Sequence, residues 1–133
     1  MKGLKLFQSE KIRTKWEENE EKWYFSVVDV VAVLTDNDYL QARKYWNKLS
    51  QRLREEGNQS VTNCHQLKML SSDGKYYKTA VANTEQLLRL IQSIPSKKVE
   101  PFKLWLAKVG YERIKEIEML KNQIDFLHTK IIA

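Results

Sequence analysis

The sequence has few of the residues that build disulfide frameworks, metal sites and phosphate loops. Its 133 residues include one cysteine, Cys64, two histidines, His65 and His128, and four glycines without motif spacing. A single cysteine excludes an intramolecular disulfide framework and is typical of a reducing cytoplasm, and zinc-ligand spacing is missing. Cys64 and His65 are adjacent, so in a strand they would point to opposite faces rather than form a nucleophile–base pair. We therefore expect no enzymatic activity.

Long apolar runs are also missing. No segment is long enough to cross a bilayer, and the first eleven residues contain no apolar signal-peptide core. Hydrophobic residues nevertheless make up 42% of the chain, with 4 Trp, 6 Tyr and 4 Phe, which is enough for a packed core. We expect a cytoplasmic protein without membrane contact, with one domain over residues 1–116 and a helical tail over residues 117–133.

Acidic side chains are scarce in the middle of the chain. The formal net charge is +6, and residues 39–56 and 57–98 contribute +3 and +4 of it, whereas both ends are close to neutral. A basic region of this kind favours phosphate backbones or other anionic surfaces. The alternative is a lysine-rich surface that only keeps the protein dissolved.

The first elements that the sequence predicts are two short strands. Residues 11–17 alternate between apolar and basic side chains, residues 18–21 form a polar turn, and residues 22–25 are aromatic. This pattern predicts a β-hairpin. Ser26 and Asp29 then have the spacing of a capping box, which predicts a helix from Val27 to Leu34. The valines of that segment would equally suit a buried strand.

A second helix is predicted after a short polar turn at residues 35–38. Asp38 is a suitable N-cap, with Gln41 three residues later as its reciprocal partner. From Tyr39 the buried stripe follows helical spacing, at Ala42, Trp46, Leu49 and Leu53. The two helices and their turn have the pattern of a helix-turn-helix, provided that the valine segment is helical.

The face opposite that stripe predicts a DNA-binding surface. It carries Lys44, Asn47, Lys48 and Gln51, flanked by Arg43, Arg52 and Arg54. Asparagine and glutamine can bind adenine edges, and arginine and lysine can bind guanine or phosphates. The alternative is an ordinary solvated helix face.

The second half of the domain is predicted to contain another hairpin and two helices. Residues 65–70 and 75–80 flank an Asp-Gly turn, which predicts a hairpin with Lys75 near its tip. Such a hairpin would touch a phosphate backbone, with Lys75 as a contact, or simply cover the core. A helix follows from Asn83 or Thr84 with a buried stripe at Leu87, Leu88, Ile91 and Ile94, and Pro95 stops it. Pro101 suits the first turn of a final helix, whose apolar face is Phe102, Trp105, Leu106 and Val109.

The tail continues with a heptad-like pattern. Isoleucine and leucine alternate at spacings of three and four, at Ile117, Leu120, Ile124, Leu127 and Ile131. Isoleucine at a and leucine at d favour a parallel two-stranded coiled coil. The pattern therefore predicts a homodimer seam or the start of a stalk, and the alternative is one more core-facing stripe.

Three separated blocks resemble the Bro-N domain of prophage antirepressors and baculovirus-repeat proteins, in the branch of DNA-damage-inducible protein D. They are WYFSVVDVVAVLTDNDYLQARKYWNKLSQRLREEG (23–57), TNCHQLKMLSSDGKYYKTAVANTEQLLRLIQSIPS (62–96) and EPFKLWLAKVGYERIKEIE (100–118). The resemblance implies an α+β domain in the cytoplasm, no cofactor and binding to double-stranded DNA in a genetic switch. The alternative is a protein-interaction module that binds a repressor or another host protein without touching DNA.

Overall fold

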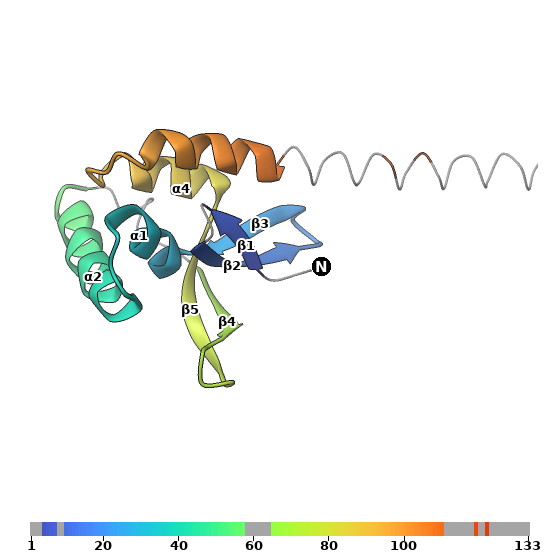
Figure 1. Cartoon of the computed structure of the whole chain (residues 1–133), viewed down its shortest axis with the longest axis horizontal. Coiled ribbons are helices and arrows are strands. Elements are labelled where there is room, and N and C mark those ends of the chain that lie inside the picture. Colours follow the sequence, from blue (N-terminus) through green and yellow to red (C-terminus); the bar gives the residue numbers. More distant parts are fainter. Residues whose placement is uncertain (1–3, 8–9, 58–64, 111–118, 120–121, 123–133) are drawn as a thin grey trace, which may run out of the picture.

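The computed structural model describes residues 4–7, 10–57, 65–110, 119 and 122, and it has the predicted α+β architecture. Five strands form one sheet in the order β1-β2-β3-β5-β4, with every neighbouring pair antiparallel. Figure 1 shows the helix pair α1 and α2 on one side of the sheet, α4 and a last helix stacked together, and the β4–β5 hairpin projecting away from both layers. The predicted tail residues Ile117, Leu120, Ile124, Leu127 and Ile131 lie outside the described residues.

The first hairpin is confirmed. Strands β2 (Glu10–Glu17) and β3 (Lys22–Ser26) pair from Thr14 opposite Phe25 to Glu17 opposite Lys22. Alternation along β2 buries Ile12 and Thr14 and turns Lys11 and Lys15 towards solvent. A further strand, β1 (Leu4–Phe7), pairs with the other edge of β2 and has no counterpart among the predicted elements.

The valine-rich segment is the helix α1 (Val27–Thr35), so the alternative of a buried strand is wrong. The Ser26 hydroxyl accepts a hydrogen bond from the backbone N–H of Asp29 at 3.3 Å, which is half of the predicted capping box. The other half is not made, because the Asp29 carboxylate binds Arg13 of β2 instead. Six apolar side chains of this short helix are buried, which explains why nearly every position is aliphatic.

The second helix, α2 (Tyr39–Glu55), begins where the sequence predicts it. The Asp38 carboxylate accepts a hydrogen bond from the Gln41 N–H at 2.8 Å, and Asp36 turns the chain with a positive φ of 55°. Gly57, with φ 84°, adopts the left-handed conformation expected after the helix. The predicted stripe is buried in full, at Ala42, Trp46, Leu49 and Leu53.

The second hairpin is also confirmed, and its second strand is longer than expected. Strands β4 (His65–Leu70) and β5 (Tyr76–Asn83) pair throughout, and Gly74 in the turn has φ 84°. The end of β5 pairs with β3, with Ser26 opposite Val81. This pairing joins the second hairpin to β3, the strand that leads directly into α1.

The last two helices complete the core, with two corrections. Helix α4 (Thr84–Ile91) starts where the sequence predicts it, with Asn83 as its N-cap, but it ends four residues before Pro95 because the backbone turns at residues 92–94. Leu88 is only partly buried, and Leu90 takes the core position expected for it. The final helix is described over residues 99–110, has Pro101 in its first turn, and buries Phe102, Leu106 and Val109.

One main hydrophobic core joins these layers. It contains at least one buried side chain from each layer, for example Phe25, Val30, Trp46, Leu87 and Phe102. None of the described helices is long and apolar enough to cross a membrane.

Candidate nucleic-acid interface

The outward face of α2 carries every residue that the sequence predicts for it. The buried stripe fixes the rotation of the helix, so the opposite side chains face solvent. All seven are exposed: Arg43, Lys44, Asn47, Lys48, Gln51, Arg52 and Arg54. The structure therefore brings these seven predicted residues together on one helix, with their hydrogen-bonding groups available to a partner.

Two of the seven have partners within the helix. The Gln51 side-chain amide donates to Glu55 at 3.3 Å, and Arg52 lies 3.9 Å from Glu56. Both contacts are exposed, so they cost little to exchange for another partner. Within the described part of the chain, Arg43, Lys44, Lys48 and Arg54 form no ion pair. The charges of these four side chains, three of them in the first two-thirds of the helix, are therefore available to an anionic partner.

Lys75 lies apart from that helix, at the tip of the β4–β5 hairpin. Its side chain is exposed, and its backbone N–H donates to the Asp73 carboxylate at 2.9 Å. The same carboxylate accepts a hydrogen bond from the Tyr77 hydroxyl at 2.6 Å, which lowers the pKa of Asp73 and raises the pKa of Tyr77. The turn is therefore held by its own hydrogen bonds, and Lys75 projects from a well-defined tip.

A groove separates the start of α2 from this hairpin, and sequence reasoning did not find it. The groove has a volume of about 1040 Å³ and is bounded by β2, by Tyr39 and by the end of β4 with its turn. Its polar lining includes Lys11, Lys15 and Lys68, all exposed. In the sequence, only the outward alternation of basic residues along β2 pointed to this groove. The fold adds that the end of β4 forms the wall across the groove from β2.

Arg13 forms the floor of this groove and connects its walls. Its guanidinium binds the Asp29 carboxylate through Nε at 2.8 Å and Nη2 at 3.1 Å, and Nη1 donates to the Leu70 carbonyl at 3.2 Å. The guanidinium carbon lies 5.6 Å from the ring centre of Tyr39. The hydrogen bond with Asp29 raises the pKa of Arg13. One side chain thus fixes β2, α1, α2 and β4 relative to one another.

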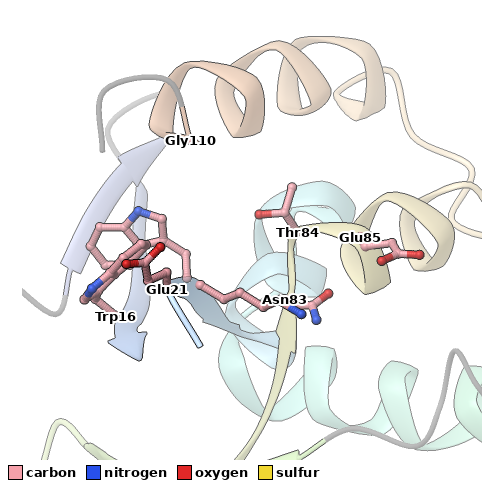
Figure 2. A pocket seen from close by; sticks show the side chains of 8 residues that line it. Trp16, Glu21, Asn83, Thr84, Glu85 and Gly110 are labelled. Atoms are coloured by element: carbon pink, nitrogen blue, oxygen red, sulfur yellow. The ribbon is translucent and has the colours of Figure 1, made fainter. Parts of the chain in front are cut away.

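A second, smaller pocket of about 290 Å³ lies elsewhere on the domain. Figure 2 shows Trp16 and Glu21 on one side of it, Asn83, Thr84 and Glu85 on the other, and Gly110 above. The lining mixes two tryptophans with charges of both signs, so it has no net attraction for phosphate. The described residues contain no group of side chains suited to a metal ion.

The comparisons with known proteins identify the domain. The family model for the N-terminal domain of the BRO family matches residues 11–113, which include all of the elements from β3 to α4 and both surfaces described above. No curated protein and no solved structure matches the chain. Because the family model covers most of the sequence, the chain belongs to the BRO family through its N-terminal domain, a family associated with DNA-binding regulatory proteins of phages and baculoviruses.

Proposed function

We propose that this protein is a DNA-binding regulator of the antirepressor type, from the branch of DNA-damage-inducible protein D, and that α2 reads duplex DNA. The observation that carries the proposal is the exposed face of α2. It presents Lys44, Asn47, Lys48 and Gln51 on successive turns, without acidic residues before Glu55. We also propose that the protein has no catalytic activity and acts in the cytoplasm, on the sequence evidence given above.

The chemistry of the helix suits the major groove. A helix fits the width of that groove, and amide side chains at Asn47 and Gln51 can form paired hydrogen bonds with adenine. Lys44 and Lys48 can neutralise phosphates on either side or bind guanine. Family membership supports the same reading, because BRO-type N-terminal domains are associated with DNA-binding regulators.

The proposal is tested by the salt dependence of DNA binding. Binding of the full chain to a labelled mixed-sequence duplex should weaken steeply with salt, because each neutralised phosphate releases counterions. Lys44→Ala and Lys48→Ala should each lower the slope of log affinity against log salt concentration by about 1. Lys22→Ala is the matched control, because Lys22 is also exposed and is the first residue of β3, a strand that Figure 1 shows apart from α2. A duplex affinity that does not vary with salt would rule the proposal out.

Sequence preference is tested separately with the amide residues. Asn47→Ala and Gln51→Ala remove groups that distinguish bases but carry no charge. In a selection from random duplexes, these variants should return a less restricted set of sites than the wild type. The slope of log affinity against log salt concentration should stay the same, because the amides neutralise no phosphate. Weaker binding with an unchanged set of sites would show that the amides contact the backbone instead.

One observation favours the second candidate, a module that binds a repressor or host protein. Tyr39 and Leu40, next to each other at the start of α2, are 49% and 59% exposed, and contiguous exposed apolar surface of this kind favours contact with a protein partner. Leu40→Ala removes the exposed side chain without adding a charge, so it should weaken capture of such a partner and leave the salt dependence of duplex binding unchanged. If the wild type binds a protein partner and shows no affinity for DNA, this second function replaces the first.

We further propose that the tail forms a homodimer through Ile117, Leu120, Ile124, Leu127 and Ile131, on the sequence pattern alone. Light scattering compares the full chain with a version that ends at Glu118. The full chain should have twice the mass of the shortened monomer. Equal oligomeric states of the two versions would rule out the tail as a dimer interface.

A further inference from the structure

We propose that the groove between β2 and the β4–β5 hairpin holds the sugar-phosphate backbone of duplex DNA, beside the base pairs that α2 contacts. The inference rests on the proposed function and assigns it a second contact surface. The occupant follows from the charge of the groove, from its hydrogen-bonding groups and from its position next to α2.

The charge of the groove is positive and uncompensated. Its lining contains four cations and one carboxylate, Asp29, which already binds Arg13. Lys11, Lys15 and Lys68 are exposed and have no acidic partner among the described residues. A concave surface lined by one sign of charge concentrates the opposite charge, so an anionic chain is the complementary occupant.

The hairpin adds a second sign that an anion belongs here. Lys68 and Lys78 are directly opposite each other in the antiparallel pair, and both are exposed. Like charges at such positions destabilise a hairpin. A phosphate lying across the hairpin would turn this repulsion into two favourable contacts.

The remaining lining residues suit a sugar-phosphate chain. Ser71, Ser72, Tyr39 and Tyr76 are of the types that donate hydrogen bonds to phosphate oxygens, together with lysine. Tyr76 is 66% exposed and Leu70 is 50% exposed, so apolar surface is available for the deoxyribose rings.

The position of the groove selects the backbone of a duplex. Tyr39, at its edge, is the first residue of α2, and Arg43 and Asn47 follow at spacings of four residues. These three exposed side chains therefore lie on one side of the helix. A strand that leaves the groove reaches the base-reading face directly, and in helix-turn-helix proteins the neighbouring elements contact the backbone in this way.

The experiment measures the slope of log affinity against log salt concentration for groove variants of the full chain. Lys11→Gln, Lys15→Gln and Lys68→Gln remove the charge and keep most of the side-chain stem, so the exposed positions remain compatible with the fold. Binding is measured to a labelled mixed-sequence duplex of about two helical turns. Each variant should lower the slope by about 0.9, and the triple variant by about 2.7, without changing which sequences are preferred. Lys22→Gln should leave the slope unchanged.

The outcomes separate this inference from the proposed function. If Lys44→Ala lowers the slope and the groove variants do not, the groove is not a backbone site and the function of α2 stands. If the groove variants lower the slope and the α2 variants do not, the groove is a backbone site and the proposal that α2 reads DNA is wrong. A single-stranded oligonucleotide that binds the wild type as tightly as the duplex, with the same loss in the triple variant, would overturn the assignment to duplex DNA. A triple variant that keeps the duplex slope but no longer binds an acidic peptide would also overturn the assignment.

Discussion

Arg13 and Asp29 form a two-point ion pair that joins the first hairpin to the first helix. Two guanidinium nitrogens and the Arg13 backbone N–H all donate to the Asp29 carboxylate, and both side chains are mostly buried, at 16% and 11% exposure. Such a pair has more effect when one partner is removed than when both are replaced, because the remaining charge is left without compensation.

The first prediction concerns this pair. Arg13→Met should lower the free energy of unfolding in urea by about 2 kcal/mol, since it leaves the Asp29 carboxylate partly buried without a partner. The double variant with Asp29→Leu should recover part of that loss. Arg89→Met is the control, because the Arg89–Glu85 pair is exposed, at 56% and 74%, and its loss should cost less than about 0.5 kcal/mol. Equal losses at Arg13 and Arg89 would contradict the role given to Arg13.

The second prediction concerns the start of α2. Asp38→Ala removes the side-chain acceptor for the Gln41 N–H and should cost about 1 kcal/mol of unfolding free energy. Asp38→Ser should restore most of the loss, because a hydroxyl can accept the same bond. Thermal denaturation followed by circular dichroism measures both variants. If serine is no better than alanine, the cap does not stabilise the helix.

The third prediction compares two residues of the last helix. Phe102 is fully buried, with its ring 5.2 Å from Phe7 and 5.3 Å from Trp105, whereas Leu104 is 74% exposed. Phe102→Ala should therefore cost about 3–5 kcal/mol in urea denaturation. Leu104→Ala should change the stability by less than about 0.5 kcal/mol. A small effect at Phe102 would mean that this helix is not part of the cooperative core.

The fourth prediction concerns alkaline pH. The hydrogen bond to Glu20, at 2.6 Å, raises the pKa of the buried Tyr24 to about 12. Because the folded pKa lies above the unfolded value of about 10, the stabilisation is present below pH 10 and is lost as the pH rises towards 12. Glu20→Gln should bring the pKa of Tyr24 back towards 10, and the ultraviolet absorbance of phenolate would then appear at lower pH than in the wild type. Superimposable titrations of the two proteins would refute the assignment.

Local patterns in the sequence predict most of the elements. The stripe from Ala42 to Leu53 fixes both the helix α2 and its outward face, because one helical period determines which residues are buried. Asp73-Gly74 locates the second hairpin, since glycine adopts the positive φ that the turn needs. These features depend only on neighbours in the chain, and the resemblance to Bro-N proteins agrees with the family match.

The groove could not be predicted in the same way. Its walls come from β2, α2 and β4, and only the pairing of β3 with β5 brings them together. The partner of Asp29 is another example. A capping box predicts a contact with the Ser26 backbone, but the carboxylate finds the stronger charged donor on a strand that precedes it. Leu90 replaces Leu88 in the core for a similar reason, since the elements around α4 decide which of its sides is covered.

The pairing of β3 with β5 also has a kinetic consequence. Ser26 and Val81 are far apart in the sequence, and their alignment closes a long loop that contains α1, α2 and most of the second hairpin. The two helices can form from local contacts, whereas this closure must overcome the entropy of the whole loop and is expected to come late in folding. In a helix-rich folding intermediate the exposed basic face of α2 would then be formed, whereas the groove would not yet exist. Stopped-flow folding should show helical signal before the protein gains its full affinity for DNA.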